Sequence, residues 1–439
     1  MSDAVLRGRL AGHAAGGRFQ LFVVGGGLLA LVGAALFALS LSGEAADRAW
    51  HLFHVNWLYF TGLAGGSVAI AAVHKIVKAK WSGVVLRFAE AAVAFFPVSL
   101  LGLVLIFTLG YDHIYGPMHE QLHSMAHAKA LWLSKHWMFG RLFVGLSALY
   151  YLGWRLIRAD LLPDLADTVG QAEGARRARY DRMLAGFDNS EAGRAAHEAR
   201  LHRLAPLYAA TYAMVFTMVA FDGIMALQPH WFSNLLGGFY FMGSFLGAHM
   251  LLALTVMYAG TQTGVWHLIS PKQRHDLGKL CFGFTVFWAY LMFAQFLVIW
   301  YGNLPEETGF VFARLWGTWL PIGRAVFLGM FLIPFIGLLG VGPKKFPGTM
   351  ALFATVSLVA LWLERYLLVM PSVTTLDGPT FGLPELGPTL LMAGLFFLAY
   401  GLFARAFPMV SPRLAEITVV AERHHAVEDH FDHDEKAND

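Results

Sequence analysis

The chain has 439 residues, of which 57% are hydrophobic and 14% are charged. Soluble domains contain about 25% charged residues, so this composition excludes an ordinary soluble domain. The net charge of +3 gives no indication of nucleic-acid binding. The single cysteine, Cys281, excludes a disulfide framework and a cysteine-ligated cluster, and there is no CxxCH haem-attachment motif.

Ten apolar stretches are each long enough to cross a bilayer as a helix. A helix needs about 20 apolar residues to span the hydrocarbon, where only helices and closed barrels satisfy their own backbone. The predicted spans are 20–41, 50–73, 86–110, 132–156, 205–227, 235–259, 280–302, 321–340, 349–370 and 389–408. We therefore predict an all-α polytopic membrane protein with ten transmembrane helices.

Basic residues are concentrated in every second loop, so they lie on one side of the membrane if there are ten spans. They are frequent in the N-terminal arm, in the loops after the second and fourth spans, and at Lys344 and Lys345. The opposite loops 228–234 and 371–388 contain no lysine or arginine. By the positive-inside rule, both termini are expected to be cytoplasmic.

The hydrophilic segments divide the chain into five parts. An N-terminal cytoplasmic arm covers 1–19, spans 1–4 cover 20–156, a connector covers 157–204, spans 5–10 cover 205–408, and a cytoplasmic tail covers 409–439. The connector has helical spacing and is interpreted as solvated, with partner docking as the alternative. The charged tail is expected to be disordered. Its HHAVEDHFDHDE string contains metal-ligating residue types, and metal binding there is the less favoured hypothesis.

A short internal repeat links the second span to the sixth. At a constant offset, Tyr59, Phe60, Gly62 and Gly66 recur as Tyr240, Phe241, Gly243 and Gly247. Small residues four apart let helices approach closely in lipid, which is the simpler explanation. Because both spans also run in the same direction, the repeat favours two related four-helix bundles, spans 2–5 and 6–9, with spans 1 and 10 at the periphery.

Ionisable side chains within the spans are functional candidates, because one near the bilayer centre costs about 2.5–3.5 kcal/mol. In the first bundle, the candidates for a quinone site are His54, His136, Arg141 and Asp222. Histidine and aspartate are suitable bases for the protons that a quinol releases. A purely structural Arg141–Asp222 pair is the equally weighted alternative. Glu90 is a candidate for a proton path.

The second bundle contains the other proton-path candidates. They are His249, Gln295, Arg324, Glu364 and Arg365. A row of polar side chains from His249 to Glu364 could relay protons through ordered water. The alternatives are a structural Arg324–Glu364 salt bridge and a core histidine at position 249.

Four segments then indicate a family. They are KAKWSGVVLRFAEA at 78–91, KALWLSKHWMFGR at 129–141, FDGIMALQPHWFSNLLGGFYFMGS at 221–244 and HDLGKLCFGFTVFWAYLMFAQFLVIWYGNLPEET at 275–308. Together they resemble the second NrfD-like (polysulfide-reductase-type) membrane subunit of bacterial alternative complex III. That complex is a quinol:cytochrome c or quinol:electron-acceptor oxidoreductase of the bacterial inner membrane.

The resemblance implies ten helices with spans 2–5 and 6–9 as bundles. It also implies a set of partners: membrane lipids, a second NrfD-like subunit, iron–sulfur and c-type cytochrome subunits, and a terminal oxidase. Haems and clusters belong to those partners, so this chain would have no covalent cofactor and would use a dissociable quinone such as menaquinone. In the family one NrfD-like subunit forms the quinol site and the other serves proton movement. The aspartate of the family's FDxxM motif corresponds to Asp222, and the arginine at the end of the 129–141 segment corresponds to Arg141.

Four hypotheses follow from these residues. The favoured one is a non-autonomous subunit that contributes proton translocation and anchorage to a quinol-oxidising complex. The second is that this chain itself binds the quinol. A secondary transporter is the third, since repeats and ionisable groups in the membrane also suit transporters. The fourth is a structural scaffold.

Overall fold

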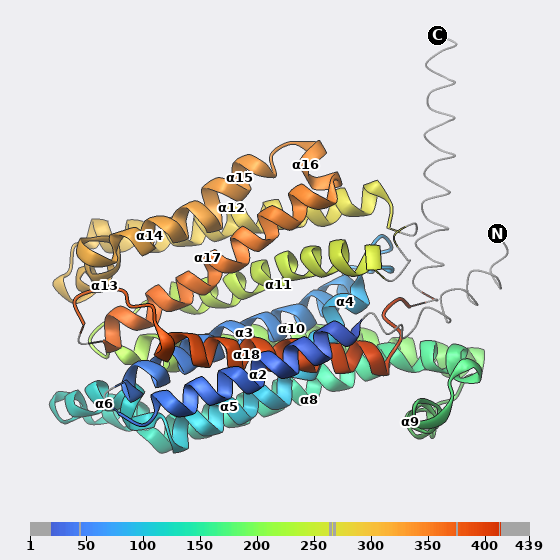
Figure 1. Ribbon diagram of the computed structural model, residues 1–439, viewed down its shortest axis with the longest axis horizontal. Helices are drawn as coiled ribbons and strands as arrows, with labels where there is room; N and C mark the ends of the chain where they lie inside the picture. The colour runs from blue at the N-terminus through green and yellow to red at the C-terminus, as the bar shows by residue number, and fades with distance from the viewer. Residues whose placement is uncertain are drawn as a thin grey trace, which may run out of the picture.

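The structure is a computed structural model that describes residues 19–43, 45–262, 266, 269–374, 376–411 and 413. Nearly all of the predicted N-terminal arm, and of the tail with its candidate metal-binding string, lies outside the described residues. Within the described residues the protein is helical and has no strand (Figure 1). The predicted all-α fold class is therefore confirmed for the described residues.

The helices follow one another through short turns. In chain order they are α2 (Gln20–Ser40), α3 (Ala46–Ile76), α4 (Leu86–Glu90), α5 (Phe96–Thr108), α6 (Tyr111–Gln121), α7 (His127–Trp132), α8 (Lys135–Thr168), α9 (Gly174–Leu184), α10 (Glu191–Gly223), α11 (Leu235–Gln262), α12 (Pro271–Gly302), α13 (Pro305–Leu315), α14 (Leu320–Phe327), α15 (Ile333–Gly337), α16 (Val341–Lys345), α17 (Pro347–Val373) and α18 (Leu383–Ala406). In Figure 1, α6 and α13 lie at one end of the long helices, and α9 and α16 lie toward the other.

Nine helical segments of the described chain are long and apolar enough to cross a membrane, so the protein is a multi-pass membrane protein. The predicted span 132–156 is not among them, although most of it lies in α8. That stretch contains Arg141 together with tyrosine and tryptophan residues such as Tyr150 and Trp154, which lower its hydropathy. The count of ten spans therefore stays a prediction.

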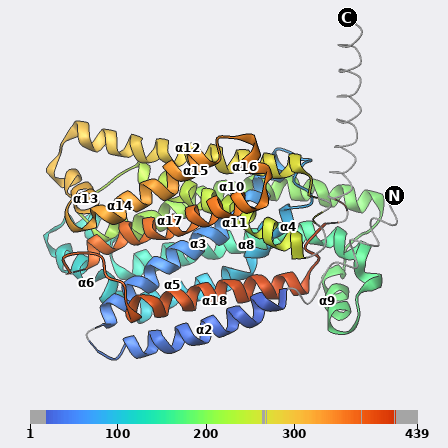
Figure 2. The same ribbon diagram turned by 45° about the horizontal axis from the view of Figure 1, so that its top comes forward.

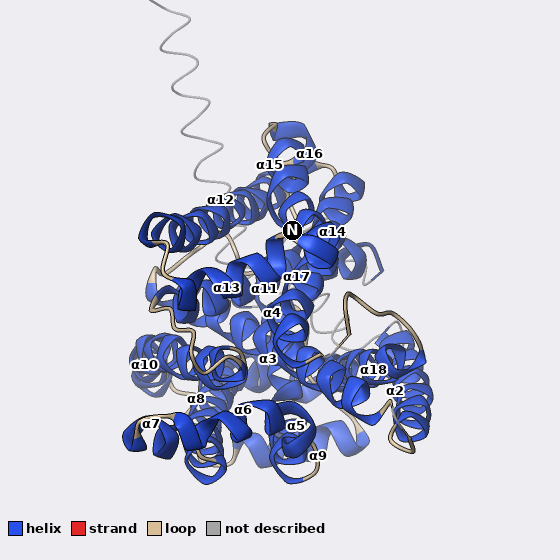
Figure 3. Ribbon diagram, turned by 90° about the vertical axis from the view of Figure 1, so that its left-hand side faces the viewer, coloured by secondary structure: helices blue, strands red, loops and turns tan. Residues whose placement is uncertain are grey.

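The long helices pack side by side (Figure 3), and we refer to α3, α5, α8 and α10 as the first group and to α11, α12, α14 and α17 as the second. α3 contacts α5, α8 and α10, and α11 contacts α12 and α17. The two groups meet where α3 packs against α11 and α17 and where α10 packs against α11. Gly62 and Gly66 of the repeat lie at the contact between α3 and α11. A Cβ on Gly66 would lie 2.7 Å from the Ser244 carbonyl oxygen, and the Tyr240 hydroxyl donates to the Leu58 carbonyl at 2.8 Å. The small residues of α3 thus allow the close approach of the two groups.

Two of the membrane-compatible segments are not regular α-helices. A 3-10 segment, Ala91–Phe95, separates α4 from α5 in the first group. A π-helical segment, Leu328–Leu332, separates α14 from α15 in the second. π-helical insertions often occur at functional sites, and this one borders the cavity described below.

The peripheral helices α2 and α18 pack along each other (Figure 2). A Cβ on Gly33 of α2 would overlap the backbone of Leu391, and one on Gly394 of α18 would overlap that of Ala30. These positions require glycine because the two backbones are in contact.

Replacing Gly33 with Leu is therefore expected to lower the free energy of unfolding by about 1–3 kcal/mol, the usual range for overpacking. Thermal unfolding of the purified protein in detergent measures this change. Gly27→Leu on the same helix is the control, because nothing lies within 4 Å of its Cβ position. Equal midpoints for the two variants would contradict the close α2–α18 contact.

Candidate functional site

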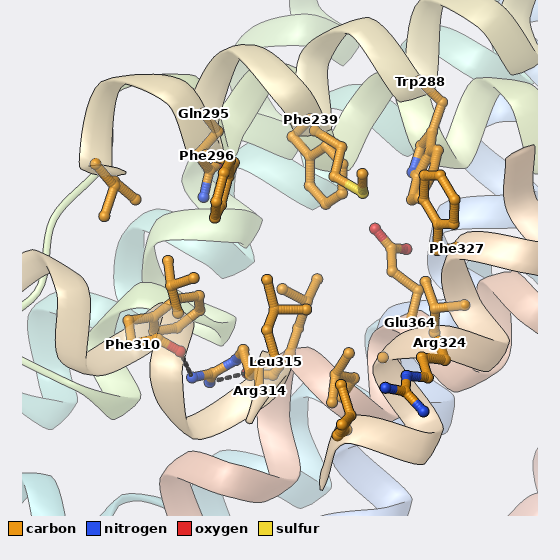
Figure 4. A pocket seen from close by; sticks show the side chains of 18 of the residues that line it. Phe239, Trp288, Gln295, Phe296, Phe310, Arg314, Leu315, Arg324, Phe327 and Glu364 are labelled. Carbon is orange, nitrogen blue, oxygen red and sulfur yellow. Dashed lines mark hydrogen bonds between the residues drawn. The ribbon is translucent and has the colours of Figure 1, made fainter. Parts of the chain in front are cut away.

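A cavity of about 530 Å³ lies in the second group, between α11, α12, α13, α14 and α17. This volume is within the range of about 300–1,000 Å³ for small-molecule sites. Its wall is mostly aromatic and aliphatic, and four polar side chains line it: Gln295, Arg314, Arg324 and Glu364 (Figure 4). An apolar cavity with few polar groups is typical of a site for a small amphiphilic ligand.

The periodicity of two helices explains how these residues reach the cavity. On α12, the lining residues are Trp288, Met292, Gln295 and Ile299, which form one stripe at helical spacing. On α17, Glu364 is followed by Leu367 and Leu368 at the same spacing. Each helix therefore directs one polar side chain into an otherwise apolar surface.

Glu364 is the buried acid of this cavity, with 3% of its surface exposed. Its Oε2 lies 2.9 Å from Nη1 of the neighbouring Arg365. The indole of Trp288 lies close by (Figure 4), but neither carboxylate oxygen has a hydrogen bond of good geometry within the described residues. A buried carboxylate without such bonds is costly, so a polar group in the cavity would stabilise it.

Arg365, next to Glu364 on α17, is held by contacts with α11. Its Nη2 donates to the Tyr240 carbonyl and to the Ser244 hydroxyl, both at 3.2 Å, and its guanidinium lies 4.3 Å from the centre of the Tyr240 ring. These contacts hold the guanidinium while the Glu364 carboxylate faces the cavity.

The buried Arg314 was not predicted as a site residue. The outer loop 303–320 folds back as α13, which places this side chain against the cavity. Its guanidinium donates to the carbonyls of Phe310 (2.9 Å) and Leu368 (2.7 Å) and to the Ser372 hydroxyl (2.6 Å). It makes no ion pair with a described carboxylate. The amphipathic pattern of 305–315, which ends in this arginine, was the available signal.

Three of the proton-path candidates meet at this cavity: Gln295, Arg324 and Glu364. Arg365 is adjacent through its ion pair with Glu364. The alternative Arg324–Glu364 salt bridge is wrong, because Glu364 pairs with Arg365 and the Arg324 side chain is exposed.

The remaining two candidates lie elsewhere. His249 is buried, donates from Nδ1 to the Phe245 carbonyl at 2.9 Å, and packs against the rings of Phe245 and Phe284. Its described surroundings are aromatic, as expected of a core histidine, and they do not continue the predicted row of polar side chains from His249 to Glu364.

Glu90 belongs to a buried ion cluster near α4, which we define as Lys75, Arg87, Glu90, Asp160, Asp164 and Arg413. Arg87 is central: it lies 2.9 Å from Glu90, 3.0 Å from Asp160 and 2.7 Å from Asp164. Lys75 and Arg413 also pair with Asp160. Glu90 is thus one of three acids that face three bases, well away from the cavity.

Three of the four quinone-site candidates come together in the first group. Arg141 holds Asp222 with two bonds, Nε to Oδ2 at 2.6 Å and Nη2 to Oδ1 at 2.5 Å. His54 Nε2 lies 2.7 Å from the carbonyl oxygen of Gly223, next to Asp222. The fourth, His136, is exposed at the start of α8 and has no hydrogen bond or ion pair with the other three among the described residues. The first turn of α8 directs it outward, whereas Arg141 lies on the inner face.

Because both oxygens of Asp222 already have donors, the geometry agrees with the structural alternative for this pair. We expect Asp222→Asn to lower the free energy of unfolding by about 2 kcal/mol, as for hydrogen bonds to charged groups. The part of the Asp222→Asn variant that assembles into the complex should still oxidise quinol. Chemical denaturation together with the turnover of the purified complex measures both effects. Normal stability with lost turnover would instead assign the quinol to Asp222.

No known protein family and no curated protein matches this sequence. The function is therefore inferred from the cavity, from the chemistry of its lining and from the resemblance of the four segments at 78–91, 129–141, 221–244 and 275–308.

Proposed function

We propose that the chain is an integral membrane subunit of a bacterial quinol:acceptor oxidoreductase similar to alternative complex III. In that complex it transfers protons and anchors the redox subunits in the inner membrane. It would cross the membrane ten times with both termini in the cytoplasm. Its partners would be a second NrfD-like subunit and the iron–sulfur and c-type cytochrome subunits, with a terminal oxidase as a further partner.

The observation that carries the proposal is the buried Glu364 carboxylate facing the cavity. A carboxylate inside the membrane is a residue type used in proton relays. The ion pair with Arg365 favours its charged form, and burial favours its neutral form.

Electron transfer has to be supplied by the partners. The only cysteine, Cys281, is buried on α12, and the sequence contains no CxxCH motif. Moving one elementary charge against 100 mV requires about 2.3 kcal/mol. Proton movement through this chain would therefore be driven by redox steps in neighbouring subunits.

The geometry gives less support to a secondary transporter. Transporters of that kind use broken helices in corresponding positions of two repeats. Here the irregular segments are Ala91–Phe95 and Leu328–Leu332, which fall in the third and eighth predicted spans. If spans 2–5 correspond to spans 6–9, the partner of the third span is the seventh, and this is the continuous α12 (Pro271–Gly302).

Purification of the affinity-tagged chain from its native membrane tests the proposal. We expect haem-containing subunits to co-purify, to give the absorbance of reduced c-type cytochrome, and to oxidise added quinol. A preparation that is intact by mass spectrometry but has no cytochrome absorbance would contradict the proposal. Solute uptake by liposomes that contain this chain alone would favour the transporter.

A further inference from the structure

We propose that a groove between α5, α8 and α18 binds one phospholipid with an anionic head group, and that Arg179 of α9 contacts its phosphate. The groove has a volume of about 610 Å³. It shares no residue with the cavity that contains Glu364, so the inference does not depend on the proposed function.

The walls of the groove are apolar and come from three separate parts of the chain. On one wall, the 3-10 segment Ala91–Phe95 runs into α5, and the small side chains of Ala94 and Pro97 leave space there. The Tyr150 hydroxyl lies 2.6 Å from the Ser99 hydroxyl, so it is already bonded. The other walls are largely aromatic, and the rings that line the groove are those of Phe96, Tyr150, Trp154, Phe403 and Phe407.

The groove opens toward the lipid. Trp154 and Leu402, which line it, are 41% and 52% exposed. Leu402 and the residues of the 3-10 segment belong to helical segments that are long and apolar enough to cross a membrane. An acyl chain of a phospholipid can therefore enter the groove from the bilayer and lie against its aromatic walls.

Arg179 is the only charged side chain among the described residues that line the groove. The hydroxyl of the neighbouring Tyr180 donates to the Ala406 carbonyl at 3.2 Å, which holds α9 at the end of α18 (Figure 1). Arg179 makes no hydrogen bond or ion pair with a described residue. An available cation thus lies at one end of an apolar groove, and a phospholipid has its phosphate and its acyl chains in the same arrangement.

The charges around Arg179 favour an anionic head group over a zwitterionic one. Asp181, the only acid of α9, lies 3.2 Å from Arg177, and no described carboxylate lines the groove. The ammonium of a choline head group would therefore find no partner. Four arginines belong to this short helix: Arg176, Arg177, Arg179 and Arg182.

The position of the groove agrees with this ligand. The arginine-rich end of the helices is the predicted cytoplasmic side, and basic pockets between transmembrane helices on that side bind anionic lipid head groups. Trp154 lies near the same end, where amphipathic rings prefer the interface between lipid and water.

Photolabelling tests the inference. The probe is a phosphatidylglycerol with a diazirine in one acyl chain, added to the purified full-length chain with the subunits that co-purify. We expect mass spectrometry to find adducts within 93–100, 150–154 or 402–407. Unlabelled dioleoylphosphatidylglycerol should prevent them, whereas dioleoylphosphatidylcholine or inorganic phosphate at the same concentration should not.

Two matched variants of α9 test the head-group contact. Arg179→Ala should raise the concentration of phosphatidylglycerol that gives half protection about fivefold, which corresponds to about 1 kcal/mol for one arginine near the membrane surface. Arg179→Lys should restore most of the affinity. Arg177→Ala removes the same charge but should have no effect, because residues two apart do not share a helix face and Arg177 does not line the groove.

A second pair of variants tests the acyl-chain contact. Ala94→Trp fills the groove and should lower the adduct yield about tenfold or more. Ala35→Trp makes the same change at an exposed position of α2 and should leave the yield unchanged. The exposed Arg179 keeps the test valid if Ala94→Trp prevents folding.

Four results would overturn the inference. Equal protection by phosphatidylcholine would show ordinary solvation by the bilayer, and protection by inorganic phosphate would show a site for a free anion. The absence of adducts in the groove would show that another subunit covers it. Equal affinities of the Arg179→Ala and Arg177→Ala variants would exclude the contact between Arg179 and the phosphate.

Discussion

Replacing Glu364 with Gln is expected to lower the rate of proton translocation at least about a hundredfold, the lower limit for a well-placed acid–base group. The amide has almost the same shape as the carboxylate but exchanges no proton. Arg365 keeps its bonds to the Tyr240 carbonyl and the Ser244 hydroxyl, so the local fold should survive. Proton uptake by proteoliposomes that contain the complex, quinol and an electron acceptor measures the effect.

Two further variants complete this experiment. Glu364→Asp retains a titratable group and should recover part of the translocation. Glu306→Gln makes the same chemical change on the exposed first turn of α13 and should leave translocation unchanged. Normal translocation in the Glu364→Gln complex would contradict the proton-transfer role and would favour a structural scaffold.

The second large effect is expected at Arg87, the centre of the ion cluster. Arg87→Leu would leave Glu90 and Asp164 without their arginine in a buried environment, where each is less than 2% exposed. Breaking a buried ion pair by removing one partner costs about 3–5 kcal/mol. We therefore expect the variant to unfold at much lower denaturant concentration or to fail to accumulate in the membrane.

The reason for this size of effect is the charge balance of the cluster. Lys75 and Arg413 pair with Asp160, so they do not replace Arg87 at the other two acids. Adding Glu90→Gln and Asp164→Asn to Arg87→Leu should restore much of the lost stability. Arg177→Leu is the control, because its pair with Asp181 is exposed and contributes little. If Arg87→Leu were as stable as Arg177→Leu, the cluster would not be a stabilising unit.

The fold could be predicted from the sequence to the extent that it depends on hydropathy. The apolar stretches correspond to long helices, and Gly62 and Gly66 of the repeat mark the contact between α3 and α11. The limits of the helices were less predictable. α8 (Lys135–Thr168) and α10 (Glu191–Gly223) extend well into the predicted connector, because the helical spacing continues there without the apolar residues that define a span.

The site was predicted in part. Gln295, Arg324 and Glu364 share a cavity, as their inclusion in one proton path suggested. The partner of Glu364 was not predictable, because neighbours on a helix do not normally face each other. Arg314 lies outside the predicted spans, and only the amphipathic pattern of 305–315 indicated that this segment packs against the membrane domain. Conversely, contact between Arg141 and Asp222 was considered from the sequence, and the two residues form an ion pair.

Cryo-electron microscopy of the purified assembly, at a resolution that shows ordered water, would show what lies beside the Glu364 carboxylate. We expect water or a quinone head group in contact with Glu364 and Gln295, in a chain that touches subunits carrying haem or iron–sulfur clusters. A Glu364 carboxylate paired only with Arg365, in a cavity that contains lipid tails and neither water nor quinone, would contradict it.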